Sequence, residues 1–136
     1  MKTLVIFLSI AASSILSLQA LSLAFASEKP TQHLQLPDVT TSEEAKKVFI
    51  ETTSELQDKR ELNQEELNEI HITTYSLEKA VAYFVENMKG DQQAEAKKLA
   101  ELVERIHLTS ETDQADKLRA YLQDYSNLAS AFAKNF

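Results

Sequence analysis

The sequence predicts an all-α protein, an up-and-down (antiparallel) four-helix bundle. Three features of the 136-residue chain indicate this fold class. Gly90 is the single glycine, and Pro30 and Pro37 are the two prolines, so residues that form turns are scarce and long helices are favoured. Apolar residues recur at spacings of three and four, as they do along one face of a helix. Residues that commonly cap helices precede the periodic stretches.

Residues 1–26 have the layout of a secretory signal peptide. Lys2 is followed by an apolar run from Leu4 to Phe25, which ends in the triplet Ala24-Phe25-Ala26. Signal peptidase accepts small residues at the first and third positions of such a triplet, so we expect export and cleavage after Ala26. The alternative is an uncleaved anchor, because a run of about 20 apolar residues can span a bilayer. After cleavage, we expect no membrane insertion.

Residues 27–40 hold both prolines and show no helical period, which predicts an extended N-terminal arm. The bundle domain is expected over residues 41–136. Thr41 can cap the first helix and Glu44, three residues later, can complete a capping box. This helix is expected to run to about Arg60, with its apolar face formed by Ala45, Val48, Phe49, Thr52 and Leu56.

The second helix has the clearest start, because Asn63 can cap it and Glu66 lies at the capping-box position. We expect it to end at Gly90, since glycine takes a left-handed backbone conformation without a steric penalty. Its apolar face follows a heptad pattern, formed by Leu67, Ile70, Thr74, Leu77, Val81, Phe84 and Met88.

Asp91 is expected to cap the third helix, whose apolar face would be formed by Ala96, Leu99, Val103, Ile106 and Ser110. The period slips over residues 110–113, where several capping residues occur together. We therefore favour a separate fourth helix after a short loop. The alternative is a third helix that continues into the fourth through a stutter. The fourth apolar face would be formed by Ala115, Leu118, Leu122, Tyr125, Ala129, Phe132 and Phe136.

Composition excludes several classes of function. The chain is acidic, with a net charge of −7, so binding to nucleic acid or to an anionic membrane surface is not expected. The absence of cysteine excludes disulfides, thiolate zinc sites and iron–sulfur clusters. One glycine cannot build a phosphate-binding loop or a nucleophile elbow. A hydrolase would rest only on scattered Ser, His and Asp residues. We expect a non-enzymatic accessory factor that acts through an unknown protein partner.

A group of polar residues lies beside the apolar faces of the second and third predicted helices. His71, Tyr75 and Glu78 share one face of the second predicted helix, because they are four and three residues apart. Glu104, His107 and Glu111 share a face of the third in the same way. If these helices fold back at Gly90, the two histidines lie within about one helical turn of each other.

This group of polar residues has two interpretations. In the first, one zinc or copper ion, or haem b, is bound, and the candidate ligands are His71, His107, Glu78, Glu104 and Glu111. Glu104-x-x-His107 is the spacing used by carboxylate-bridged di-metal bundles, but they need this pair twice, and Asn68 occupies the equivalent position before His71. In the second, the imidazoles hydrogen-bond Tyr75, Thr74 and the glutamates, and fix helix register. We expect the second, and hence no cofactor.

Two stretches carry a resemblance to a known family: EIHITTYSLE at 69–78 and VERIHLTSE at 103–111. Over residues 40–136 the chain resembles small exported proteins of Gram-negative bacteria, known as a domain of unknown function. The resemblance implies a periplasmic location and no particular activity. The second and third helices are also loosely similar to soluble b-type four-helix cytochromes. Those use a methionine early in the first helix as a haem ligand; here that helix has none, and Met88 lies at the far end of the second helix from His107.

Overall fold

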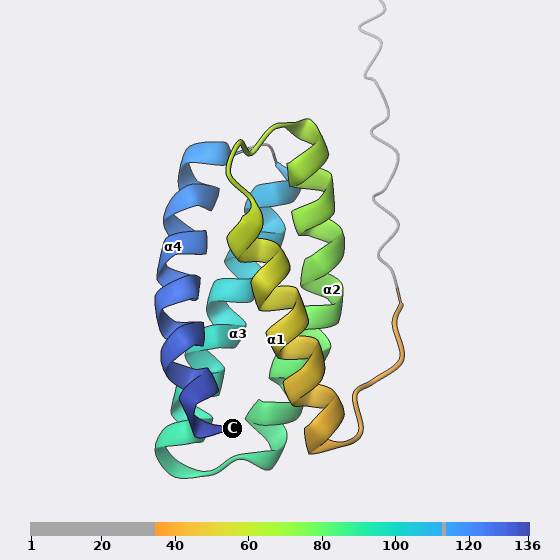
Figure 1. Ribbon diagram of the computed structural model, residues 1–136, viewed down its shortest axis with the longest axis vertical. Coiled ribbons are helices and arrows are strands. Elements are labelled where there is room, and N and C mark those ends of the chain that lie inside the picture. The colour runs from red at the N-terminus through yellow and green to blue at the C-terminus, as the bar shows by residue number, and fades with distance from the viewer. Residues whose placement is uncertain (1–34, 113) are drawn as a thin grey trace, which may run out of the picture. The chain divides into compact units, whose positions relative to one another are not determined.

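The computed structural model describes residues 35–112 and 114–136, which form four α-helices and no strand. The helices are α1 (Ser42–Asp58), α2 (Gln64–Asn87), α3 (Gly90–Glu111) and α4 (Ala115–Phe132), and a short 3-10 helix, η1 (Ala133–Asn135), follows α4. Each helix packs antiparallel to the one before it, and α1 also packs against α4 (Figure 1). The predicted all-α, up-and-down four-helix bundle is confirmed.

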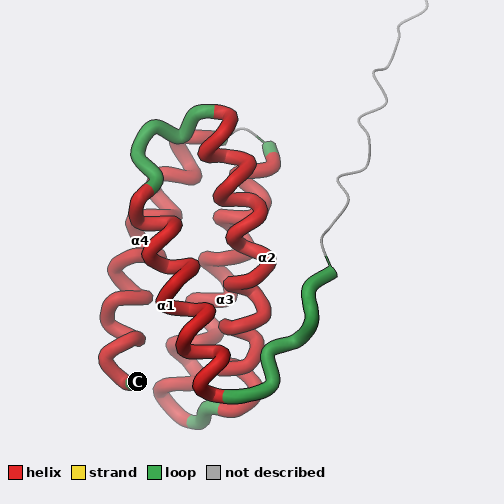
Figure 2. The backbone as a smooth tube through the Cα atoms, turned by 45° about the vertical axis from the view of Figure 1, so that its right-hand side comes forward, coloured by secondary structure: helices red, strands yellow, loops and turns green. Residues whose placement is uncertain are grey.

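The N-terminal predictions are only partly covered by the described residues. The predicted signal peptide, residues 1–26, lies outside them, as do residues 27–34 of the predicted arm. Residues 35–40 have no regular secondary structure and lead into α1 as the green tube of Figure 2. Within the described part of the chain, no helix is both long and apolar enough to span a membrane.

The helices α3 and α4 are separate, so the alternative of one continuous helix is wrong. The N–H of Thr112 still donates to the carbonyl of Leu108 at 3.3 Å, but the backbone of Thr112 (φ −101°, ψ 13°) has left the helical region. The N–H of Gln114 then donates to the carbonyl of Thr109 at 3.1 Å. This wider turn ends α3 and allows the chain to reverse into α4.

Thr41 and Asn63 cap α1 and α2, as predicted. The N–H of Glu44 donates to Thr41 Oγ1 at 3.2 Å, and the N–H of Glu66 donates to Asn63 Oδ1 at 3.0 Å. Each bond satisfies one of the N–H groups that the first turn of a helix leaves without an intrahelical acceptor. Because capping is a local interaction, the sequence alone located both helix starts.

The loop between α1 and α2 is organised by the carboxylate of Glu66. It accepts the N–H groups of Leu62 at 2.7 Å, Glu61 at 2.8 Å and Arg60 at 3.4 Å. The bond from Leu62 is the main cause that holds the pKa of Glu66 below its ordinary value. Leu62 has a left-handed φ of 51°, which is unusual for a residue other than glycine, and its side chain is buried. The buried side chain of Leu62 and the carboxylate of Glu66 together stabilise this loop conformation.

The turn between α2 and α3 differs from the prediction. Gly90 has the expected left-handed φ of 59°, but it begins α3, whereas α2 ends at Asn87. Lys89 occupies the N-cap position without a side-chain cap bond, so Asp91 lies inside the first turn and is not the cap. A glycine with positive φ permits reversal, but it does not determine on which side the helix boundary falls.

The predicted apolar faces form the core. Toward the Gly90 turn, the rings of Phe49, Phe84, Phe132 and Phe136 pack with centroids 5.3–5.7 Å apart. These edge-on and tilted contacts are favoured between aromatic rings. The predicted faces of α2 and α3 are buried, namely Leu67, Ile70, Thr74, Leu77, Val81 and Phe84 of α2, and Ala96, Leu99, Val103, Ile106 and Ser110 of α3.

One buried polar pair links α1 to α4. The hydroxyl groups of Thr53 and Tyr125 lie 2.6 Å apart, and both residues are buried. Burial raises the pKa of Tyr125 well above its ordinary value, and the bond with Thr53 acts in the opposite direction. The pair therefore remains neutral and acts as a structural contact.

Candidate functional site

His71 on α2 and His107 on α3 lie against each other. Their ring centroids are 4.5 Å apart and their planes are inclined by 42°. His107 is buried and His71 is partly buried. Because α2 and α3 are antiparallel neighbours joined at Gly90, residues at similar distances from this turn meet. The predicted proximity of the histidines is confirmed.

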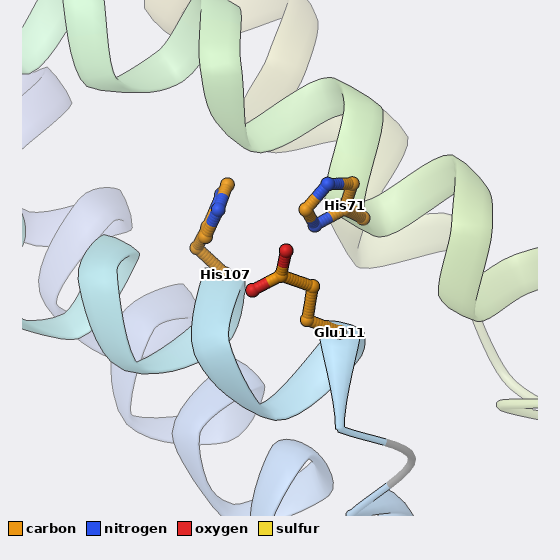
Figure 3. Close-up of side chains that lie close together, drawn as sticks. All are labelled: His71, His107 and Glu111. Atoms are coloured by element: carbon orange, nitrogen blue, oxygen red, sulfur yellow. The ribbon is translucent and has the colours of Figure 1, made fainter. Parts of the chain in front are cut away.

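Glu111 completes a group of three potential metal ligands with these histidines. It follows His107 by four residues and so lies on the same side of α3. One ligand atom from each of the three residues lies within 4.8 Å of the other two. Figure 3 shows the Glu111 carboxylate pointing from the end of α3 toward the gap between the two rings. Two imidazoles and a carboxylate are a ligand set that zinc uses, with the fourth coordination position left to water.

Two residues of α2 hold the Nδ1 atom of His107. Thr74 Oγ1 lies 2.8 Å from it and Glu78 Oε1 lies 3.4 Å from it. The Thr74 hydroxyl donates its one proton to the backbone carbonyl of His71 at 2.6 Å, so toward His107 its oxygen acts as an acceptor. Nδ1 of His107 therefore carries a proton, and the neutral ring has its lone pair on Nε2.

Tyr75 orients the other imidazole. Its hydroxyl lies 3.0 Å from His71 Nε2. Its buried ring packs edge-on against both histidines, with centroid distances of 5.1 Å to His71 and 5.0 Å to His107. These contacts fix the orientation of the His71 ring. The hydrogen bonds of the histidines to Thr74 and Tyr75 are those that the structural interpretation predicted.

The five candidate ligands do not form one set. The structure brings together His71, His107 and Glu111, whereas Glu78 and Glu104 lie outside this group. Glu78 approaches the Nδ1 atom of His107 that Thr74 also holds. Glu104, one turn before His107, lines a neighbouring cavity. Helical spacing makes Glu104 and Glu111 equivalent neighbours of His107, and the position of α2 beside α3 selects Glu111.

The neighbouring cavity has a volume of about 600 Å³ and lies between residues 35–38 and the helices α2 and α3. Lys79 Nζ pairs with Asp38 Oδ1 at 2.5 Å and fastens this segment to α2. This cavity could not be predicted from the sequence, because nothing in the residue pattern of the arm indicates its contact with α2. The cavity is predominantly acidic, and its lining residues are Gln35, Leu36, Pro37, Asp38, Tyr75, Glu78, Lys79, Glu104, His107 and Leu108.

Comparison with known proteins places this chain in a family. Residues 1–134 match DUF6746, a family of unknown function. The chain belongs to DUF6746. The match confirms the resemblance to an uncharacterised family and is longer than the likeness noted over residues 40–136. No curated protein and no solved structure matches the chain. Membership of DUF6746 therefore assigns no ligand to the histidine pair.

Proposed function

We propose that this DUF6746 protein is an exported, non-enzymatic bundle that binds one zinc or copper ion through His71, His107 and Glu111. The observation that carries the proposal is the convergence of three ligand atoms within 4.8 Å, contributed by two different helices. Imidazole and carboxylate are suited to zinc, and imidazole is also a good ligand for copper. This proposal departs from our expectation of no cofactor, because the sequence did not reveal that Glu111 joins the histidines.

The residues around the ligands support the proposal. A metal-binding histidine usually donates its second ring N–H to an oxygen, which fixes the tautomer and the ring orientation. Thr74 and Glu78 provide such oxygens for His107 Nδ1, and the hydroxyl of Tyr75 lies within hydrogen-bond distance of His71 Nε2. Both rings are thus oriented by neighbouring side chains of α2.

The geometry favours a bare ion over haem b. Two axial imidazoles hold haem iron through one nitrogen each, from opposite faces of the porphyrin, so the iron and its macrocycle must lie between the two rings. The centroids of His71 and His107 are only 4.5 Å apart. The site also differs from a di-metal bundle, because Asn68 does not supply the second glutamate–histidine pair.

The cavity beside His107 offers a route for a cation. Asp38, Glu78 and Glu104 line it, and Lys79, its one lining lysine among the described residues, is paired with Asp38. A concave surface with excess negative charge raises the local concentration of cations. We propose capture or delivery of the ion as the role, because the acidic cavity borders His107, one of the three proposed ligands.

Export is the second component of the proposal and rests on residues 1–26. The mature protein should begin at Ser27 and be found in the periplasmic fraction. Mass spectrometry of the purified native protein tests this directly. Recovery of a chain that retains Met1 or the apolar run would contradict cleavage.

The metal proposal is tested with untagged mature protein, since a histidine tag binds the same ions. Zinc or copper added to chelator-treated protein at 100 times its Kd should stabilise the fold by about 2.7 kcal/mol. For a domain of this size, the melting temperature should rise by about 4–8 °C per kcal/mol. The double variant His71→Leu/His107→Leu should lose this response and keep its helical circular dichroism spectrum.

The third histidine provides a matched control. His33→Leu removes an imidazole from the predicted arm, so the melting temperature of this variant should respond to the metal as the wild type does. A wild-type melting temperature that is indifferent to both zinc and copper would contradict the proposal. The histidine pair would then serve only to fix the register of α2 and α3.

A further inference from the structure

A second cavity, of about 390 Å³, lies between the α1–α2 loop and α4. The described residues that line it include three cationic side chains, Lys59, Arg60 and Arg119, and no carboxylate. This composition is opposite in sign to the protein as a whole, which has a net charge of −7. The cavity shares no lining residue with the histidine site or the acidic cavity beside it.

The excess positive charge resides on the two arginines. Lys59 forms an ion pair with Glu69, which offsets the charge of the ammonium group. Arg60 and Arg119 form no ion pair among the described residues. A guanidinium group presents a planar fork of donors that matches a carboxylate or a phosphate.

The backbone of the loop positions these arginines. The N–H of Arg60 donates to Glu66 at 3.4 Å, and its carbonyl accepts a hydrogen bond from Arg119 Nη1 at 3.3 Å. This last bond engages one of the five N–H donors of Arg119, so the other donors are available to a ligand. The loop is itself held by the buried side chain of Leu62, so Arg119 is anchored to a well-supported segment.

The remaining lining is apolar or neutral. The buried side chains of Leu56 and Leu62, together with the partly buried Leu122, supply hydrocarbon surface. Gln57 and Ser126, which hydrogen-bond each other at 2.9 Å, add neutral polar groups. Cavities that bind small molecules commonly have volumes of about 300–1,000 Å³ and combine apolar walls with a few polar anchors.

We infer that this cavity binds a small organic anion. Its carboxylate or phosphate group pairs with Arg60 and Arg119, and its apolar body lies against Leu56 and Leu62. The inference is independent of the proposed metal site, because it involves different residues and a ligand of opposite charge.

The test is an NMR titration of the full mature protein with three probes of similar size. Benzoate and phenyl phosphate share an aromatic ring and differ in the anionic group, whereas benzylamine carries a positive charge on the same ring. At least one of the two anions should shift the amide signals of residues 59–62 and 119–126. A shift with only one of them would show which head group the site accepts. Benzylamine should leave these signals unchanged.

Arg119→Gln should weaken the binding of the anion about tenfold to a hundredfold, the usual effect of losing a hydrogen bond to a charged group. Lys117→Gln is the matched control, because it removes one exposed positive charge from the same helix outside this cavity. It should change the Kd less than about twofold, since Lys117 does not line the cavity and its charge would act on the ligand only through screening solvent. Arg60→Gln provides a second variant if Arg119→Gln alters the spectrum of the unliganded protein.

Three results would overturn the inference. These are the absence of shifts with either anion, binding of benzylamine as tightly as the anions, and equal effects of Arg119→Gln and Lys117→Gln. The last result would show that net charge, rather than a built site, attracts the anion.

Discussion

Replacing Thr74 with valine removes the hydroxyl that holds His107 while preserving the size of the side chain. In the wild type this hydroxyl lies 2.8 Å from His107 Nδ1, and the buried threonine has no exposed surface. Valine cannot accept the N–H bond, so the imidazole loses the partner that fixes its tautomer and orientation. We expect Thr74→Val to weaken zinc binding without unfolding the protein.

The magnitude follows from the two contacts of Nδ1. Losing the outer partner of a metal-bound histidine typically costs about 10–100-fold in affinity. Glu78 lies 3.4 Å from the same nitrogen and is retained in Thr74→Val, so we expect a loss of about tenfold, the low end of that range. The double variant Thr74→Val/Glu78→Leu, which removes both oxygens from Nδ1, should approach the hundredfold limit. The free energy of unfolding of the metal-free protein should fall by about 1 kcal/mol for the lost hydrogen bond.

Thr53→Val is the matched control for this experiment. Thr53 is also buried and hydrogen-bonded, at 2.6 Å to Tyr125, but it links α1 to α4 and belongs to neither helix of the histidine site. It should lose a similar stability of about 1 kcal/mol with unchanged zinc affinity. Competition with a chromophoric chelator measures the affinity, and urea denaturation of metal-free protein measures the stability. Wild-type affinity in Thr74→Val, or equal losses in both variants, would refute this reasoning.

Three further changes test the fold. Phe84→Ala removes a buried ring from the aromatic cluster and should cost about 3–5 kcal/mol in urea denaturation, whereas Ile50→Ala, at a site 54% exposed, should cost less than about 0.5 kcal/mol. Gly90→Ala should cost about 1 kcal/mol, solely from its positive φ, because a Cβ there would meet no atom within 4 Å. The pKa of Glu66 is lowered by folding, so its stabilising effect is lost as pH falls through that lowered pKa. Glu66→Gln should therefore reduce the loss of stability between about pH 5 and pH 3, followed by circular dichroism.

Hydrogen bonds between residues close in the sequence explain which helix boundaries could be predicted. Thr41 and Asn63 were identified as caps because each accepts a bond from a residue three positions later, a relation visible in the sequence. Asp91 was assigned wrongly as the cap, because α3 begins at Gly90, two residues earlier than an Asp91 cap predicts, and Lys89 takes the N-cap position. The polar side chains at residues 110–113 were compatible with the end of one helix and also with a stutter in a continuous helix. In the structure the backbone of Thr112 leaves the helical region, so α3 ends there.

The histidine site was predictable to the extent that it depends on spacing within helices. The similar separations of His71 and His107 from the reversal at Gly90 were enough to bring the two rings together, and the four-residue spacing placed Glu111 on the same face as His107. Spacing within the helices does not show which of Glu78, Glu104 and Glu111 lies with the two histidines. That choice depends on the rotation and axial position of α2 against α3, which the packing of the whole core determines.

The sequence by itself therefore determined the helical class, two of the helix caps and the proximity of the histidines. Each of these follows from short-range periodicity or from one antiparallel turn. Only the tertiary structure decided whether α3 and α4 are separate, which carboxylate lies with the two histidines, and where the two cavities form. Asp38 pairs with Lys79 across 41 residues, and Arg119 bonds Arg60 across 59. Contacts of this range leave no periodic trace in a single sequence, because they arise when separate helices pack and bring unrelated loops together.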